Sequence, residues 1–221
     1  NFRHLFQQRL LNDHDVSVFL DVGANTGQTG QALRKRGYTE QIISFEPLSG
    51  PFQALEHAAQ GDPLWSCINT ALGTDEREAE MNVMEFDASS SMLKPKHDFL
   101  DRLPGSSDTQ VESVTVTTLD AFYASRDDLD APTYLKIDTQ GFEMNVLQGA
   151  ADVLSRIDFV ETETSLVELY EDQHLMQDVV AWMDNHGFRV INVHPHFMEP
   201  DTGFFSQADI IFSKIPPLAD D

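Results

Sequence analysis

Three acidic residues end short apolar runs of the chain, and each is placed to bind a ligand. Asp21 precedes the segment Val22-Gly23-Ala24-Asn25-Thr26-Gly27, Glu46 ends the next apolar run, and Asp138 ends a later one. The glycines allow a sharp turn and a close approach of the backbone to a ligand. An acidic residue at the position of Glu46 can accept hydrogen bonds from both hydroxyls of a ribose. The spacing therefore predicts a nucleoside cofactor.

The loop composition indicates which nucleoside cofactor it is. A dinucleotide site favours Gly-x-Gly-x-x-Gly, because backbone amides and a helix N-terminus hold the pyrophosphate. Here Asn25 stands at the second glycine position, and Asp21 adds a negative charge beside the loop. A carboxylate attracts the methionyl ammonium of S-adenosylmethionine and repels a pyrophosphate. We expect S-adenosylmethionine. An NAD-linked oxidoreductase and a non-catalytic binding protein on the same fold are the alternatives.

Asp138 and Glu163 are the candidates for proton transfer. A carboxylate at Asp138 is able to take a proton from a hydroxyl nucleophile, to ligate a metal, or to cap the following helix. Glu161 and Glu163 lie two residues apart in an expected strand and therefore share one face. Asp138 and Glu163 together have the oxygen ligands that Mg²⁺ prefers, although no clear metal motif supports such a site. His174 is a second-rank candidate for the base.

Three further polar positions near these residues each have a simple explanation. Lys136, two residues before Asp138, is either a cation of the cleft or a solvent-facing side chain. Glu143 falls in the first turn of an expected helix, where it compensates the helix dipole. His194-Pro195-His196 offers two imidazoles for a transition metal, but its expected place in a loop favours an ordinary surface role.

The elements that position these residues alternate between strands and helices along the chain. The expected strands cover residues 16–22, 41–46, 65–69, 133–138, 158–163, 188–193 and 209–213. The expected helices cover residues 2–12, 26–36, 50–59, 142–156 and 176–186. This order predicts an α/β fold with a mostly parallel seven-stranded sheet, helices on both faces and an antiparallel edge strand. Ligands bind at the carboxyl ends of the strands in such a sheet.

One segment, residues 78–118, interrupts this alternation. Residues 78–86 and 111–117 alternate apolar and polar side chains, as strands with one wet face do. Between them, residues 87–110 are rich in Ser, Asp, Lys and Pro, and a loop of that length is typically a functional lid. We expect a single domain over residues 1–221 with a leading helix in residues 1–15 and an inserted β-hairpin that carries a lid.

Composition limits the partners of the protein. The net charge is −23, with 14 basic and 37 acidic residues, which disfavours binding to nucleic acid or to anionic membranes. No apolar run reaches the roughly 18 residues that cross a bilayer. Cys67 is the single cysteine, which excludes an intrachain disulfide and fits the cytoplasmic location that we expect. The sequence begins at Asn1, so it leaves open whether a targeting segment precedes it. It does not indicate the oligomeric state.

Several segments resemble the FkbM-type methyltransferase family and occur in the family's order. They spread over roughly residues 18–212, and residues 135–149 together with Ala71-Leu72-Gly73 are the most specific. The segments are Asp21 to Gly27, Phe45-Glu46-Pro47, Asn69-Thr70-Ala71-Leu72-Gly73, Ser89-Ser90-Ser91-Met92-Leu93, Val116-Thr117-Thr118-Leu119-Asp120 and residues 135–149.

The resemblance implies a Rossmann-like class I methyltransferase fold, S-adenosylmethionine as donor, and transfer to a hydroxyl oxygen of a sugar, glycan or other small molecule. The resemblance does not settle whether a metal takes part. From the positions at the strand ends, we expect Asp138 first and Glu163 second to be the carboxylate that removes or orients the hydroxyl proton. Ser90 and Ser91 would belong to the lid over the acceptor. The cofactor would contact Asp21, Gly23, Asn25 and Gly27 at its methionyl end, Glu46 and Pro47 at the ribose, and Asn69, Ala71 and Leu72 at the adenine.

Overall fold

A seven-stranded sheet in the order β3-β2-β1-β7-β8-β10-β9 forms the centre of the molecule. The computed structural model describes residues 2–84, 90–97, 110–126, 129, 131–198 and 202–214. The strands of this sheet are β1 (Val18–Val22), β2 (Gln41–Phe45), β3 (Trp65–Ile68), β7 (Thr133–Ile137), β8 (Phe159–Ser165), β9 (Arg189–Met198) and β10 (Phe205–Ser213).

Strands β3, β2, β1, β7 and β8 are parallel to one another, whereas β10 runs antiparallel to both β8 and β9. The predicted mostly parallel seven-stranded sheet with an antiparallel edge is therefore confirmed. The strand order reverses beside β1, which has β2 on one side and β7 on the other. This is the place where sheets of this kind bind ligands.

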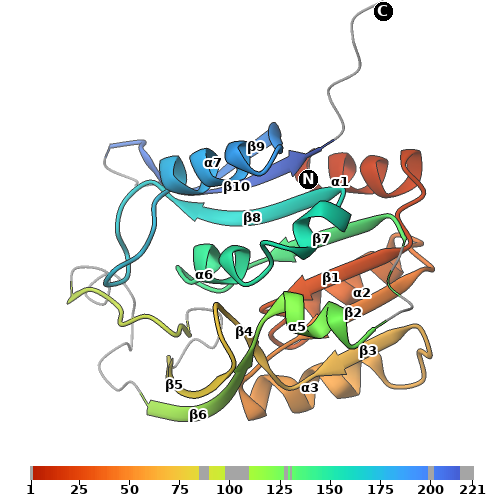
Figure 1. Cartoon of the computed structure of the whole chain (residues 1–221), viewed down its shortest axis with the longest axis horizontal. Helices are drawn as coiled ribbons and strands as arrows, with labels where there is room; N and C mark the ends of the chain where they lie inside the picture. The colour runs from red at the N-terminus through yellow and green to blue at the C-terminus, as the bar shows by residue number, and fades with distance from the viewer. Residues whose placement is uncertain are drawn as a thin grey trace, which may run out of the picture.

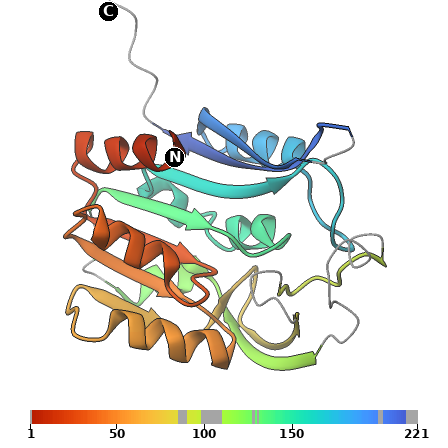
Figure 2. The ribbon, with the colours of Figure 1, turned by 180° about the vertical axis from the view of Figure 1, so that it is seen from behind.

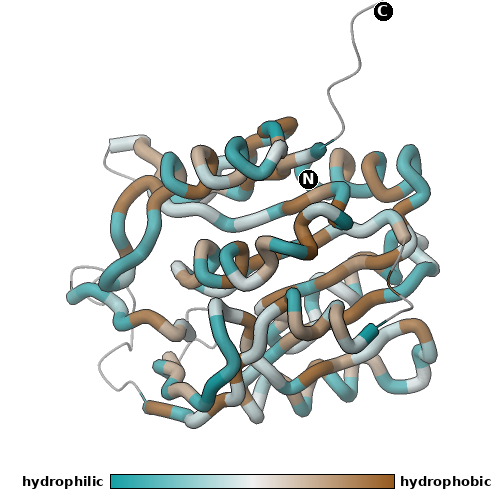
Figure 3. The backbone as a smooth tube through the Cα atoms, viewed as in Figure 1, coloured by the Kyte–Doolittle hydropathy of each residue, from teal (hydrophilic) through white to brown (hydrophobic). Residues whose placement is uncertain are grey.

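Helices cover both faces of the sheet (Figures 1 and 2). One face carries α1 (Phe2–Asp13), α2 (Gln28–Lys35) and α3 (Ser49–Ala59), and the other carries α5 (Leu119–Ala124), α6 (Glu143–Gln148) and α7 (Met176–Asn185). Each interface has its own apolar core. Alternate residues of the central strands face opposite sides of the sheet, and both sets are mostly apolar. The central strands therefore appear as largely apolar segments (Figure 3). No described helix is long and apolar enough to cross a membrane.

A polar row crosses the middle of the sheet on the face of α1 and α2. Asp21 of β1, Lys136 of β7 and Glu161 of β8 are direct neighbours in the strand register. All three side chains are buried. The same face is apolar two residues earlier in each strand, where Phe19 stacks on Tyr134 with 5.0 Å between ring centroids. The face of the sheet that carries α1 and α2 thus changes from apolar to polar towards the carboxyl ends of these strands.

The helix predicted over residues 142–156 is wrong in its length. Helix α6 ends before Gly149, and a separate 3₁₀ helix, η2 (Val153–Arg156), follows. A Cβ at Gly149 would lie 1.8 Å from the carbonyl oxygen of Gly73, so the two backbones pack directly against each other. This long-range contact ends the regular helix at a position where the local pattern alone would continue it.

The predicted insertion forms a second, three-stranded sheet in the order β4-β6-β5. Its strands are β4 (Ala71–Leu72), β5 (Arg77–Val83) and β6 (Gln110–Thr117). The expected antiparallel pairing of the last two is confirmed. Of the expected lid loop, residues 90–97 and 110 are described, and the rest of that prediction lies outside the described residues. The described part pairs Ser91 with Asn82 and Pro95 with Tyr170, so it bridges the small sheet and the loop after β8.

The prediction of a loop at His194-Pro195-His196 is wrong, because these residues lie inside β9. Strand β10 begins at Phe205, earlier than expected, and its backbone pairs along the whole of this segment. The longer partner therefore extends β9 past the end that its own sequence pattern suggested.

Candidate active site

The glycine loop after β1 lies against the ends of both neighbouring strands. The Gly23 and Ala24 amides donate to the carbonyl oxygen of Phe45 at 3.1 and 3.0 Å, and the Asp138 amide donates to Val22 O at 2.9 Å. Gly23 has a φ of +78°, and a Cβ there would lie 2.0 Å from the carbonyl oxygen of Asp138. Only glycine satisfies this close approach, and it brings the carboxyl ends of β1 and β7 together.

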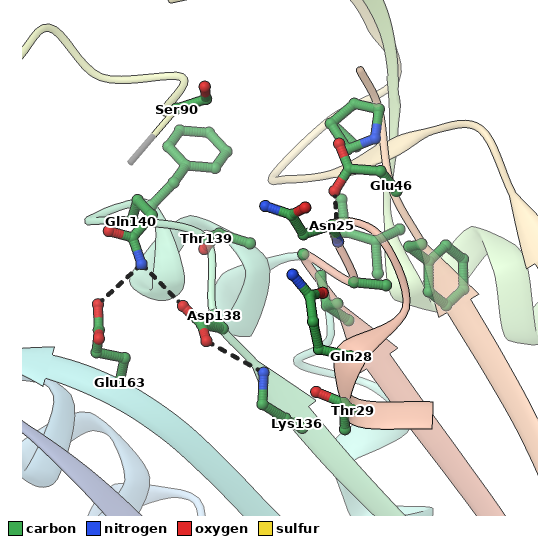
Figure 4. A pocket seen from close by; sticks show the side chains of 18 of the residues that line it. Asn25, Gln28, Thr29, Glu46, Ser90, Lys136, Asp138, Thr139, Gln140 and Glu163 are labelled. Atoms are coloured by element: carbon green, nitrogen blue, oxygen red, sulfur yellow. Dashed lines mark hydrogen bonds and ion pairs between the residues drawn. The ribbon is translucent and has the colours of Figure 1, made fainter. Parts of the chain in front are cut away.

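Glu46 at the end of β2 organises the rim of this loop. Its Oε2 accepts from the Asn25 amide at 2.8 Å and its Oε1 accepts from the Leu48 amide at 2.9 Å (Figure 4). The Asn69 side chain donates to the carbonyl oxygens of Glu46 and Pro47, both at 2.9 Å. Glu46 also lines the cavity described below, so its carboxylate is placed to meet a ligand there.

A cavity of about 620 Å³ opens over these strand ends. Its lining includes Gly23, Asn25, Glu46, Pro47, Ala71 and Leu72, which were all predicted to contact a cofactor. Met81, Met92 and Phe142 add apolar side chains to the lining. Lys136, Asp138 and Glu163 also line the cavity, and they gather away from Glu46 to form its polar half (Figure 4). The cavity therefore offers apolar side chains, suited to an aromatic base, together with a half that holds charged and amide groups.

Asp138 and Glu163 are joined by the side chain of Gln140. The Nε2 of Gln140 donates to Asp138 Oδ1 at 2.8 Å and to Glu163 Oε2 at 3.1 Å (Figure 4). Gln207 of β10 also donates to Glu163 Oε2, at 2.6 Å. Gln140 itself has a φ of +54°, a conformation that side-chain-bearing residues seldom adopt. The loop thus holds an unfavourable backbone geometry in which one amide bridges two carboxylates.

The two carboxyl groups differ in proton affinity. Burial tends to raise the pKa of Asp138, but the Lys136 charge and the hydrogen bonds from Gln140 and Lys136 outweigh it and lower that pKa. Burial, followed by the negative charges of Asp138 and Glu143, raises the pKa of Glu163 well above the usual range. The arrangement therefore separates an ionised carboxylate from one that binds a proton more tightly.

Lys136 belongs to the cavity and is not solvent-facing. Its Nζ lies 3.2 Å from Asp138 Oδ2 and 3.6 Å from Asp21 Oδ1. Asp21 is fully buried beneath it and does not line the cavity. Burial is the largest influence on Asp21 and raises its pKa. Asp21 therefore acts on the cavity through Lys136.

Glu143 does more than compensate a helix dipole. It is buried, and its Oε1 accepts from the amides of Thr139 and Gly141, both at 3.0 Å. Burial is the main cause that raises its pKa to about 7. Glu143 therefore fixes the loop that carries Asp138 and Gln140.

The described part of the lid reaches the cavity at two residues. Ser90 and Met92 line it, while Ser91 points away and donates to the carbonyl oxygen of Gln140 at 2.6 Å. The Ser90 hydroxyl accepts from the Met84 amide at 3.0 Å. Of the two predicted lid serines, Ser90 therefore faces the cavity and Ser91 fastens the segment to the loop after β7.

Besides Asp21 and Ser91, three more predicted site residues lie outside the cavity lining. His174 is exposed on the loop before α7, so the structure does not bring this candidate base to the carboxylate pair. Asn69 is exposed and holds the backbone of Glu46 and Pro47 instead of facing the cavity. Gly27 is buried at the start of α2 with a φ of +86° and packs towards Leu55 and Trp65.

A second branch of the cavity runs between α1 and α2. We call it the α1–α2 cleft and define it by its lining residues, which are Arg3, His4, Gln7, Gln28, Ala32 and Arg36. No feature of the sequence predicted the three residues of α1. Their position follows from tertiary contacts of α1: Arg3 binds Glu161 and Asp209, and Gln7 donates to Glu161 at 2.7 Å. Gln28, Ala32 and Arg36 are spaced four residues apart and therefore share one face of α2, but this spacing alone does not indicate what that face contacts.

Among the described residues, no group of three His, Cys, Asp or Glu side chains is arranged to hold a metal ion. The carboxylates proposed for Mg²⁺, Asp138 and Glu163, instead share the amide of Gln140.

Comparison with known proteins gives a family match that covers most of the chain. Residues 21–190 match the model of the methyltransferase FkbM domain. The 2-O-methyltransferase NoeI of Sinorhizobium fredii is 25% identical over 193 residues, which are 83% of this chain and 77% of NoeI.

Solved structures share the fold at low sequence identity. Magnesium protoporphyrin IX methyltransferase (ChlM) from Synechocystis, solved with bound S-adenosylmethionine, has a TM-score of 0.53 at 10% identity, with 96% of this chain and 76% of ChlM covered. TrmK of M. capricolum, solved with S-adenosylhomocysteine, has a TM-score of 0.54 at 9% identity, with 97% and 68% covered. The predicted Rossmann-like class I methyltransferase fold is therefore confirmed.

Proposed function

The chain belongs to the methyltransferase FkbM family, and we propose that it methylates a hydroxyl oxygen of a saccharide or another small hydroxyl compound. S-adenosylmethionine is the methyl donor of this methyltransferase. The 2-O-methyltransferase activity named for NoeI supports oxygen as the methyl acceptor. The observation that carries the proposal is the Asp138–Gln140–Glu163 arrangement in the polar half of the cavity.

The residues around the glycine loop fit the donor. The Glu46 carboxylate lines the cavity as an acceptor for ribose hydroxyls, and Leu72, Met81 and Phe142 offer an apolar environment to an adenine ring. The ionised Asp138 carboxylate provides a charge for the methionyl ammonium. The donor supplies a methyl group bonded to positively charged sulfur.

A hydroxyl group must lose its proton when its oxygen is methylated. The acceptor oxygen forms the new bond to the methyl carbon, the carbon–sulfur bond breaks with its electrons remaining on sulfur, and the hydroxyl proton passes to a carboxylate. Glu163 is the better proton acceptor of the pair, because its pKa is raised while that of Asp138 is lowered. A base is most effective when its pKa is near the working pH. Asp138 then orients the hydroxyl and the donor.

Cofactor binding and acceptor chemistry are tested separately. Isothermal titration calorimetry of the purified chain with S-adenosylmethionine should show saturable binding, and a Glu46→Gln variant should bind more weakly. Methyl-labelled donor is then incubated with a panel of mono- and oligosaccharides and with matched amines. We expect label in an alkali-stable ether on a saccharide hydroxyl. Absence of cofactor binding at millimolar concentration, or label confined to nitrogen, would contradict the proposal.

A further inference from the structure

The α1–α2 cleft contains a cation whose bonding differs from that of its neighbours. Arg3 forms ion pairs with Glu161 and Asp209, and Lys136 lies near Asp21 and Asp138. Arg36 has no carboxylate within ion-pair distance among the described residues. This is notable in a chain with 37 acidic and 14 basic Lys and Arg residues.

The guanidinium of Arg36 is held in place but only partly satisfied. Its Nη2 donates to Gln7 Oε1 at 2.8 Å, and Gln7 in turn donates to Glu161. The Nε of Arg36 is buried and has no hydrogen-bond partner among the described residues. A guanidinium with unused donors in a partly desolvated cleft is a ready site for a carboxylate or phosphate.

The helix end does not explain this orientation. Arg34, Lys35 and Arg36 follow one another at the C-terminal end of α2, where positive charge is favourable. Arg34 turns away to Asp62, and Lys35 is exposed. These two already provide charge at the helix end, and only Arg36 lines the cavity.

The nearby carboxylates do not compete for Arg36. Glu161 accepts hydrogen bonds from Arg3, Gln7 and Tyr134, and Asp209 pairs with Arg3. His4 lines the same cleft. Burial, and then the positive charges of Arg36 and Arg3, lower its pKa. The cleft around Arg36 therefore holds positive charge that the described residues leave without an ion-pair partner.

We propose that the acceptor carries an anionic group, a carboxylate or a phosphate, which binds Arg36 in the α1–α2 cleft. This inference rests on the proposed function, since it identifies the acceptor class of the same cavity. Gln28 lines the same cleft about two helical turns away from Arg36 and offers an amide to the sugar hydroxyls. An acidic or phosphorylated saccharide would place its anionic group at Arg36 and extend its hydroxyls towards Glu163.

The experiment measures ligand binding rather than turnover. The wild-type chain, Arg36→Gln and the control Lys35→Gln, which removes a charge from the exposed neighbouring position, are titrated by NMR with and without S-adenosylhomocysteine. The ligands are methyl glucuronide, glucose 6-phosphate and neutral methyl glucoside. We expect both anions to bind wild type and Lys35→Gln alike, and Arg36→Gln at least about tenfold more weakly. An Arg36→Lys variant should recover part of the affinity.

The outcomes distinguish the anionic acceptor from the proposed methyltransferase function. Equal anion affinity in wild type and Arg36→Gln, or no preference of the wild type for the charged sugars over methyl glucoside, overturns the anionic acceptor. A preference for the glucuronide over the phosphate assigns a carboxylate, and the reverse assigns a phosphate. If the wild type does not bind S-adenosylhomocysteine at all, this result would instead contradict the proposed function. Thermal unfolding of each variant verifies that it is folded.

Discussion

Lys136 points its ammonium group at Asp138 from two residues earlier in the chain, with 3.2 Å between Nζ and Oδ2. On its other side lies Asp21, at 3.6 Å. Burial opposes the charge of Lys136, but the charges of Asp138 and Asp21 outweigh burial and raise its pKa. One buried cation therefore lies between two carboxylates, and it lowers the pKa of Asp138 while only partly offsetting the effect of burial on Asp21.

Replacing Lys136 by Met should destabilise the protein in a pH-dependent way. Two carboxylates lose their cation, and breaking a buried pair costs about 3 kcal/mol or more. At lower pH these carboxyl groups take up protons, so the loss should be smaller at pH 5 than at pH 8. Chemical denaturation at both pH values provides the measurement, with the exposed Lys35→Met as control. An equal loss at both pH values would argue against this role.

Glu163→Gln should reduce kcat by about 100-fold or more while cofactor affinity is kept, if Glu163 accepts the proton. In the wild type, the raised pKa of Glu163 means that kcat/KM should rise with pH as this group loses its proton. The variant should lose this dependence. Glu168→Gln, at an exposed position after β8, is the control. A flat wild-type profile would exclude Glu163 as the base.

Gln140→Leu removes the amide that links the two carboxylates and retains a similar volume. The pKa of Glu163 should rise further because it loses a donor, so the pH profile should shift upwards and kcat should fall about tenfold at neutral pH. Gln148→Leu makes the same replacement at an exposed position of α6. The kinetic pKa and calorimetric cofactor affinity are measured for both. An unchanged kinetic pKa would remove Gln140 from the proton-handling group.

Gly23→Ala and Gly37→Ala separate backbone strain from collision. Both glycines have positive φ, +78° and +90°, but a Cβ at Gly37 meets nothing within 4 Å. Gly37→Ala should therefore cost only about 1–2 kcal/mol. Gly23→Ala should cost more and abolish cofactor binding, because its Cβ collides with the carbonyl of Asp138. Denaturation and calorimetry test this, and similar losses in the two variants would contradict it.

Glu143→Gln should flatten the pH dependence of stability. The folded-state pKa of Glu143 is raised to about 7, so its contribution to stability is present below the unfolded pKa and is lost as the pH rises through 7. Relative to the variant, the wild type should lose on the order of 3 kcal/mol between pH 4 and 8. Denaturation midpoints over this range give the measurement. Parallel curves for the two proteins would show that Glu143 does not titrate in this way.

The strand ends were predictable because buried strands appear as apolar runs, and the polar residue after each run marks the carboxyl edge. This logic placed Glu46 and Asp138 in the cavity. It failed where distant residues decide the structure. Gly149 ends α6 because of Gly73, and Gln140 gains its role only when β8 brings Glu163 beside it.

The assignment of Asp21 also needed the structure. Its sequence position predicts contact with a cofactor, but the pleat turns its side chain beneath Lys136. The cleft residues Arg3, Gln7 and Arg36 gave no signal, since a helical pattern does not say which neighbour a helix will face.

Helix α1 lies before the residues that match the family model, yet it forms one wall of the α1–α2 cleft. Its polar attachment depends on two side chains, Arg3 and Gln7, that both bind Glu161. Replacing α1 by a different helix that keeps these two anchors is therefore expected to change the acceptor side of the cavity while the donor-binding residues stay the same.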